Sequence, residues 1–210
     1  NIKKNVFVTG SLSLDGINRK KLVDKEAFQK KLRINFLKKK KIFIVVFHPD
    51  TTISINKNIS NLKTLIVFLR KFEENIIFTY PNADEGYQQF INIIDRLNKY
   101  RNFFVIKNLG QNMYFSALKF SNLLIGNSSS GIIEAPSFKI PILNLGNRQK
   151  NRVAIKSVIN AKFNSQDLQT KYNYINTKKY IDKLKRLKNI YERPNIVKNA
   201  KIIILRLIKK

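Results

Sequence analysis

The chain alternates short, almost continuously apolar runs with longer stretches in which apolar residues recur every three or four positions. The short runs are rich in β-branched and aromatic residues, which is typical of strands buried on both faces of a sheet. We expect six strands, at residues 5–10, 42–49, 75–81, 102–108, 122–128 and 140–146. The longer stretches predict helices at residues 20–37, 59–72, 87–100, 113–120, 131–138, 177–187 and 196–208.

This alternation predicts an α/β fold, with a Rossmann-like parallel sheet flanked by helices. Connections in such a sheet are right-handed, and ligands bind at the carboxyl ends of its strands. Small and polar residues follow five of the predicted strands, at residues 9–10, 48–49, 80–84, 127–131 and 146–149. We therefore expect one binding site where these five turns converge.

The stretch GNSSSGIIEA, residues 126–135, follows a predicted strand and opens a predicted helix. The free N–H groups and the positive dipole end of a helix favour an anion, and the hydroxyls of Ser128 and Ser129 would add donors. The alternative is an ordinary serine N-cap, although three serines are more than a cap needs. The Gly-Lys-Ser/Thr signature of a P-loop is absent.

Two charged residues accompany this turn. Glu134 lies in the first turn of the predicted helix, where it either compensates the dipole or accepts hydrogen bonds from a ribose. Arg148 follows the next predicted strand in the sequence GNRQ. Its guanidinium could form two hydrogen bonds with a phosphate, or it could be one of 41 basic side chains in solvent.

The single histidine, His48, ends a predicted strand in the sequence FHPDTT. A lone histidine is more often structural, but at this edge it could donate to a phosphate or act as a general acid or base. Asn82 lies in YPNADEG, which reads as a turn, and its amide could bind a sugar or a base. The residues alone therefore indicate a binder of an anionic nucleotide or a phosphate.

The composition is strongly basic, with 41 Lys and Arg against 13 Asp and Glu and a net charge of +28. A nucleic-acid partner would explain such a charge if the basic residues were clustered. The lysines are instead spread along a chain that is also rich in Ile and Asn, as an AT-rich coding sequence would produce. We therefore expect no nucleic-acid partner, and with no Cys and one His we expect neither a metal site nor a cofactor.

The apolar runs fall well short of the roughly 20 residues that span a bilayer. No charged and then apolar leader precedes the first predicted strand. We expect a cytoplasmic protein with no membrane partner. The chain begins with Asn1 rather than Met, which is consistent with a fragment.

Five motifs resemble, in order and spacing, the carboxyl-terminal half of hydrolysing UDP-N-acetylglucosamine 2-epimerases, which serve sialic and legionaminic acid synthesis. The motifs are VTGSLSLD, FHPDTT, TYPNADEG, IGNSSSGIIEAPSF and ILNLGNRQ. They lie within a resemblance that spans residues 6–159. The non-hydrolysing sister enzymes are expected to carry an Asp-Ser-Gly-Gly type of turn in place of GNSSSG. The resemblance therefore favours the hydrolysing branch.

The resemblance implies a glycosyltransferase-B-like protein of two halves with the substrate between them, of which this chain matches the second. Residues 1–190 would form the UDP-binding domain. Residues 191–210 would form a helix that packs toward an amino-terminal domain absent from this chain. Without that domain the apolar helix would be exposed, which would favour a homo-oligomer.

The resemblance also implies roles for the residues of the predicted site. Ser128 and Ser129 would hold the diphosphate of UDP-N-acetylglucosamine or a related UDP-sugar, and Arg148 would clamp it. Glu134 would hold the ribose.

Four further residues would surround the same substrate. Asn82 and Tyr114 would lie near the uracil, and Gly10 would line the cleft. His48 would lie near the phosphates or the reacting sugar, and it is the one candidate catalytic residue in this half.

The implied reaction eliminates UDP while a proton leaves C2 of the sugar. The glycal-type intermediate is then hydrated to free N-acetylmannosamine or a diacetamido analogue. The acidic residues that move the proton belong to the other half. The alternatives are half of a non-hydrolysing epimerase or of a related glycosyltransferase, a decayed reading frame without activity, and a basic nucleic-acid-binding module. The last gives no reason for the GNSSSGIIEA and GNRQ pair.

Overall fold

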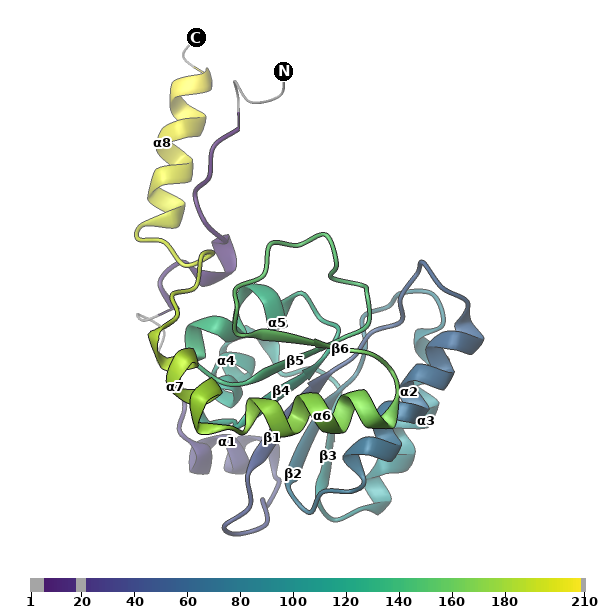
Figure 1. Ribbon diagram of the computed structural model, residues 1–210. Coiled ribbons are helices and arrows are strands. Elements are labelled where there is room, and N and C mark those ends of the chain that lie inside the picture. The colour runs from purple at the N-terminus through teal and green to yellow at the C-terminus, as the bar shows by residue number, and fades with distance from the viewer. Residues whose placement is uncertain (1–5, 18–21, 209–210) are drawn as a thin grey trace.

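Six strands form one parallel sheet in the computed structural model, which describes residues 6–17 and 22–208 (Figure 1). The strands are β1 (Ile42–Val46), β2 (Asn75–Thr79), β3 (Phe103–Ile106), β4 (Leu123–Gly126), β5 (Ile142–Leu145) and β6 (Val158–Ala161). They lie in the order β3-β2-β1-β4-β5-β6, and every neighbouring pair is parallel. The order reverses between β1 and β4, and sheets of this kind bind ligands at that switch point.

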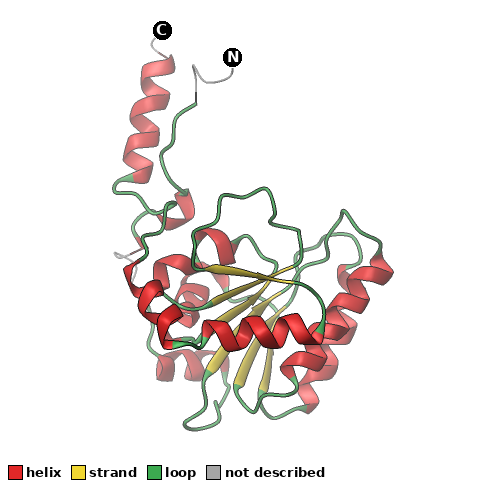
Figure 2. Ribbon diagram, viewed as in Figure 1, coloured by secondary structure: helices red, strands yellow, loops and turns green. Residues whose placement is uncertain are grey.

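Helices cover both faces of the sheet (Figure 2). One face carries α2 (Ile55–Leu69), α3 (Tyr87–Asp95), α6 (Ser165–Ile175) and α7 (Lys178–Arg186). The other carries α1 (Lys25–Leu32), α4 (Gly110–Phe120) and α5 (Ser130–Ile133). Successive side chains of a strand point to opposite faces, so Phe43 of β1 joins the first core and Ile44 the second. Burial on both faces explains why the strands have continuously apolar sequences.

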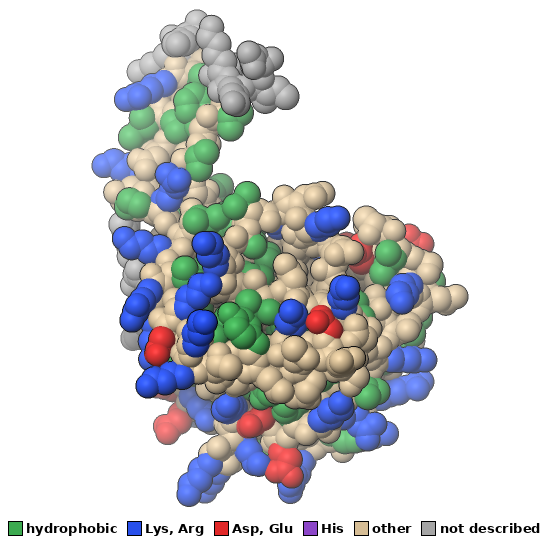
Figure 3. All heavy atoms as spheres, viewed as in Figure 1, with side chains coloured by type: hydrophobic (Ala, Val, Ile, Leu, Met, Phe, Trp, Pro, Cys, Tyr) green, Lys and Arg blue, Asp and Glu red, His purple; other side chains and the backbone are tan. Residues whose placement is uncertain are grey.

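The last helix, α8 (Ile196–Ile208), projects from the domain beside the amino-terminal segment (Figure 1). A short 3-10 helix in that segment, η2 (Leu12–Leu14), contacts α8, and its Leu14 is buried in the core. Of the residues of α8, only Ile196 is fully buried. Its other large apolar side chains are mostly exposed, and Figure 3 shows apolar groups along this projecting arm.

One predicted strand was wrong, and one strand was missed. Residues 6–10 belong to no strand and pair with none among the described residues, and Asn5 lies outside them. Val6, Phe7 and Val8 are 61%, 50% and 71% exposed, so their apolar run does not reflect a place in the sheet. The sixth place belongs to β6, a four-residue edge strand with exposed Asn160. The other five strand predictions are confirmed with shorter bounds.

The helix predictions are confirmed in position but differ in extent, and α6 was missed. The helix expected at 20–37 is only α1, which ends where Arg33 turns left-handed at φ 54°, and residues 20–21 lie outside the described part. The stretch 131–138 divides into α5 and a 3-10 helix, η5 (Ala135–Phe138), at Pro136, which has no N–H for an α-helix to use. The stretch 87–100 likewise divides into α3 and the 3-10 helix η4 (Arg96–Lys99).

Gly126 ends β4 at the switch point, and only glycine fits there. Its φ is +150°, and a Cβ would lie 2.0 Å from the carbonyl oxygen of Val46 in the neighbouring strand. We expect Gly126→Ala to lower the free energy of unfolding by about 3 kcal/mol or more, because the strands would have to separate. Urea unfolding would measure this change.

Gly131→Ala is the matched control, because a Cβ there would make ordinary contacts at 3.5 Å with Ile142 and Leu124. In this helical position the change should alter stability by no more than about 1 kcal/mol. Equal effects of the two substitutions would contradict the steric account of the switch point.

Candidate functional site

Asn127 joins the ends of β1 and β4. Its side-chain oxygen accepts a hydrogen bond from the N–H of His48 at 2.8 Å, and its side-chain nitrogen donates to the carbonyl of His48, also at 2.8 Å. The carbonyl of Asn127 accepts from the side-chain nitrogen of Gln149 at 2.9 Å. All three residues are buried, where an unpaired amide group is costly, and Oε1 of Gln149 is the one buried side-chain atom among them that has no partner in the described part of the chain. The turns after β1, β4 and β5 are therefore held in a fixed arrangement.

The imidazole of His48 is held in one tautomer. Its Nδ1 accepts a hydrogen bond from the backbone N–H of Asn82 at 2.9 Å, so the ring proton of the neutral form is on Nε2. The pKa of His48 is lowered to about 4, mainly by burial and also by the positive charge of Arg148, while the negative charge of Asp84 opposes both. At neutral pH His48 is therefore an uncharged hydrogen-bond donor.

The serine turn directs a hydroxyl proton toward the cavities. Ser130 donates its one hydroxyl proton to Oγ of Ser128 at 3.1 Å, so the Tyr114 hydroxyl, 2.7 Å away, must donate to Ser130. Burial raises the pKa of Tyr114, which keeps that phenol protonated. Ser128 also accepts from the backbone N–H of Ser130 at 3.3 Å. Its own proton is thus left to donate to a ligand.

Ser129 occupies the N-cap position of α5, but its side chain makes no capping hydrogen bond. Four other helices use such a cap: the side chains of Asp24, Ser54, Asn164 and Thr177 each accept from a backbone N–H. The turn before α5 therefore differs from an ordinary serine N-cap, which was the alternative interpretation of the sequence.

Arg148 extends from the loop after β5 and is weakly held. One guanidinium nitrogen lies 3.4 Å from a carboxylate oxygen of Asp84, and another lies 3.4 Å from the carbonyl of Asn127. The side chains of the ion pair are 25% and 30% exposed, and such pairs add little to stability. Arg148 is therefore available to a stronger anion.

Two adjoining cavities lie at the carboxyl ends of the strands. The larger, of about 550 Å³, is lined by His48, Asn82, Ser128, Ser129 and Arg148 among others. The smaller, of about 360 Å³, shares His48, Asn82 and Ser128 with it and adds Tyr114 together with apolar Val46, Pro81 and Leu109. The larger suits a charged group with several acceptors, and the smaller suits a flat group with an apolar face.

Six of the eight predicted site residues line these two cavities, and Glu134 and Gly10 do not. Glu134 follows α5, where one carboxylate oxygen accepts from Ser13 at 2.7 Å and the other is buried without a partner among the described residues. Gly10 packs against the carboxyl-terminal segment instead. Its φ is +98°, and a Cβ would lie 2.9 Å from the carbonyl oxygen of Tyr191.

The sequence did not single out Asn127, Ser130 and Gln149, which hold the site in place, or Asp84, which pairs weakly with Arg148. All four lie within the turns or motifs that the sequence did identify. Spacing indicates which turns converge, but it does not show which polar side chain in a turn faces the protein.

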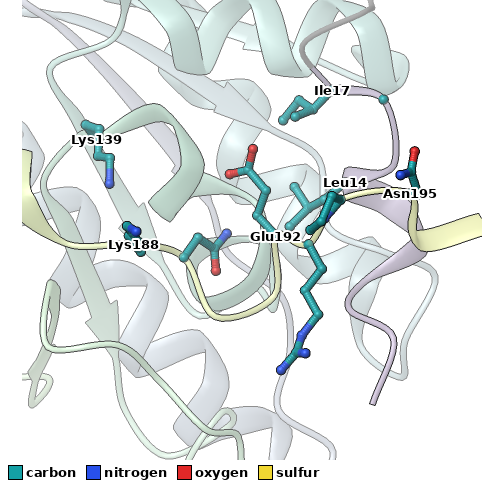
Figure 4. Close-up of a pocket in the computed structure, with 10 residues that line it drawn as sticks. Leu14, Ile17, Lys139, Lys188, Glu192 and Asn195 are labelled. Atoms are coloured by element: carbon teal, nitrogen blue, oxygen red, sulfur yellow. The ribbon is translucent and has the colours of Figure 1, made fainter. Parts of the chain in front are cut away.

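A third cavity, of about 450 Å³, lies away from the strand ends, beside the carboxyl-terminal segment (Figure 4). Lys139 and Lys188 lie on one side of it, and the Glu192 side chain points toward Ile17. Its buried amide, Asn189, donates to the carbonyl of Ile133 and to Ser137 and accepts from the N–H of Tyr191. The protein itself therefore satisfies this amide, and the strand-end cavities remain the candidate site.

A solved structure shares this fold. The S. aureus MnaA-UDP co-structure superposes with a TM-score of 0.70 at 17% identity, and the match covers 99% of this chain and 56% of that chain. This likeness confirms the expected Rossmann-like half of a glycosyltransferase-B-like fold. A family profile described as UDP-N-acetylglucosamine 2-epimerase matches residues 1–205. The chain belongs to this enzyme family.

Two curated relatives are similar in sequence. The GDP/UDP-N,N'-diacetylbacillosamine 2-epimerase (hydrolyzing) of Campylobacter jejuni is 34% identical over 169 residues, which are 79% of this chain and 43% of that protein. Polysialic acid biosynthesis protein P7 of Escherichia coli is 35% identical over 211 residues, which are 98% of this chain and 52% of that protein. The chain thus spans about half the length of these relatives.

Two further findings concern residues 6–17 and 22–208. None of the helices described there is long and apolar enough to cross a membrane. No cluster of three or more His, Asp or Glu side chains in this part of the chain could hold a metal ion.

The low pKa of His48 makes stability depend on pH. The unfolded chain binds a proton near the ordinary pKa of 6.5, whereas the native chain does so only near 4. The stability that neutral His48 contributes is therefore present above pH 6.5 and is lost as the pH falls toward 4. Between pH 7.5 and 5 we expect the native protein to lose about 2 kcal/mol more than His48→Asn.

Urea unfolding of both proteins at a series of pH values would measure the difference. The Asn side chain can still accept from the N–H of Asn82, so the turn is conserved in the control. Parallel curves for the two proteins would contradict a buried, neutral His48.

Proposed function

We propose that the chain is the UDP-binding half of a hydrolysing UDP-sugar 2-epimerase. The complete enzyme would release UDP and N-acetylmannosamine, or a diacetamido analogue, for nonulosonic acid synthesis. Family membership and the names of the curated relatives support the reaction type. The proposal includes the cytoplasmic location expected from the sequence.

The observation that carries the proposal is the convergence of two donors on one cavity. The proton of Ser128 is left for a ligand, and Arg148 is held by contacts of only 3.4 Å. Both line the larger cavity at the switch point. A diphosphate has the charge and the acceptors that this pair requires.

The same donors would assist catalysis. Negative charge develops on UDP as its bond to the sugar breaks, and preorganised donors stabilise that charge. Ser128, Ser129 and Arg148 would supply these donors. Neutral His48 would add its Nε2–H, because its low pKa leaves no proton to give up as an imidazolium near pH 7. The groups that move the C2 proton would come from the other half.

The remaining contacts follow the shape of the smaller cavity. Asn82 and apolar Pro81 would lie against the uracil, and the hydroxyl of Tyr114 would act through Ser130. The unpartnered oxygen of Glu134 would accept from the ribose. Gly10, which lines neither cavity, would act by letting the amino-terminal segment approach Tyr191.

The net charge of +28 offers a nucleic-acid-binding module as the rival function. Figure 3 shows Lys and Arg distributed over the whole visible face rather than gathered in one groove. The distribution therefore favours the nucleotide-sugar function.

We also propose that α8 docks on the missing half of the enzyme. A wide apolar helix surface is ordinarily buried against another element, and α8 exposes Ile204, Leu205 and Leu207. Residues 6–8 add further exposed apolar side chains at the same end of the molecule. The relatives are about twice as long, so they have a further half available to cover this surface.

Product analysis on the complete enzyme would test the reaction. Incubation with UDP-N-acetylglucosamine or its diacetamido analogue should yield UDP and a free amino sugar in equal amounts, detected by anion exchange and NMR. A UDP-linked epimer as the product would instead support a non-hydrolysing enzyme.

Arg148→Ala should weaken UDP binding by about 1.5–3 kcal/mol, roughly 10- to 150-fold, because a charge-assisted contact to phosphate is lost. Isothermal titration calorimetry on the chain would measure it. Lys150→Ala, in the same loop but exposed and outside the cavities, should leave the affinity unchanged. Unchanged affinity in Arg148→Ala would count against the clamp.

The chain alone should self-associate through α8. Replacing both Ile204 and Leu207 with Lys should make it monomeric, because two charges would interrupt the apolar surface. Light scattering after size exclusion would give the mass. The same two charges at exposed positions of α6, Gln166→Lys with Thr170→Lys, should change nothing. A native chain that is monomeric at all concentrations would contradict this proposal.

A further inference from the structure

Ser13 and Glu134 form a hydrogen bond across 121 positions of the sequence. The Ser13 hydroxyl donates to Oε1 of Glu134 at 2.7 Å. The other carboxylate oxygen, Oε2, is buried and has no partner among the described residues. A buried carboxylate oxygen without a donor is costly, so this atom needs a donor from a ligand or from water.

The direction of this contact follows from counting protons. A serine hydroxyl has one proton, and that of Ser13 goes to Glu134. The Ser11 hydroxyl lies 2.9 Å from that of Ser13 and must therefore be the donor between the two. A donor that itself accepts a hydrogen bond is polarised and donates more strongly. Ser11, Ser13 and Glu134 therefore form a directed chain that ends on the carboxylate.

The position of Ser13 is fixed by contacts at several points. The N–H of Ser11 donates to the carbonyl of Tyr191 at 2.9 Å, and the carboxylate of Asp15 accepts from the N–H of Val197 at 3.1 Å. Leu14, next to Ser13, is only 2% exposed. The short helix η2 is therefore anchored on both sides of the serine that reaches Glu134.

We propose that Ser13 is a positioning residue for nucleotide binding. It holds Oε1 of Glu134 so that Oε2 accepts hydrogen bonds from the 2′ and 3′ hydroxyls of the ribose. Because Oε2 is closed to solvent and Glu134 lines neither cavity, the ribose would reach it by opening the wall of the smaller cavity, where Gln111 donates to the carbonyl of Ser13 at 3.3 Å. This inference rests on the proposed function, since it requires that the chain bind UDP. It assigns to the VTGSLSLD motif a role in ribose recognition, exerted through a residue far away in sequence.

The test compares UDP with 2′,3′-dideoxy-UDP, which lacks both ribose hydroxyls. Ser13→Ala should weaken UDP binding about 5- to 20-fold in calorimetry and leave the affinity for 2′,3′-dideoxy-UDP unchanged. Ser13→Thr retains the hydroxyl and should restore binding of UDP. Ser60→Ala, an exposed serine of α2 outside both cavities, is the control and should change neither affinity.

A merely structural role would weaken both ligands equally, and that result would overturn the proposal. So would an unchanged affinity for UDP. If Ser13→Ala does not fold, Ser13→Cys serves instead: it keeps the size of the side chain but donates only weakly, so it should weaken UDP binding and leave the affinity for 2′,3′-dideoxy-UDP unchanged. A native chain that folds and binds no UDP would overturn the proposed function itself, which distinguishes the two failures.

Discussion

The site depends on the pair of hydrogen bonds between the Asn127 side chain and the backbone of His48. They join β1 to β4 where the sheet order reverses, and Gly126 allows the two strands to approach there. The side chain of Gln149 donates to the carbonyl of Asn127 and so attaches the loop after β5 to the same residue. Because these amides are buried, loosening any one of them would leave unpaired polar groups. The buried amide pairing therefore sets the distance between the serine turn, the histidine and the arginine.

The directions of the hydrogen bonds then determine which kind of ligand the site can bind. Tyr114 donates to Ser130 and Ser130 to Ser128, so Ser128 is left to donate, and the His48 tautomer is left to donate from Nε2. Donors on both sides of one cavity, with an arginine beside them, require an acceptor-rich anion. This is why a diphosphate suits the site better than a neutral ligand or a metal ion.

Sequence patterns predicted most of this architecture for definite reasons. The strands that are buried on both faces have apolar sequences and were found, and their order along the chain brought His48, Ser128 and Arg148 to one edge. The pattern was wrong at residues 6–8, where the apolar side chains are exposed and form no strand. It also missed β6, because a strand at the edge of the sheet is short and partly polar. The hydrogen-bond network of Asn127 could not be predicted from the sequence, because it depends on the orientation of each polar side chain.

The central claim is that the strand-end site recognises a nucleoside diphosphate and that the basic charge is incidental. The most direct measurement is calorimetry of the chain with UDP, uridine and a single-stranded oligonucleotide at two salt concentrations. UDP should bind far more tightly than uridine, while the oligonucleotide should bind weakly. No difference between UDP and uridine, with tight and strongly salt-dependent binding of the oligonucleotide, would contradict it and support the nucleic-acid module.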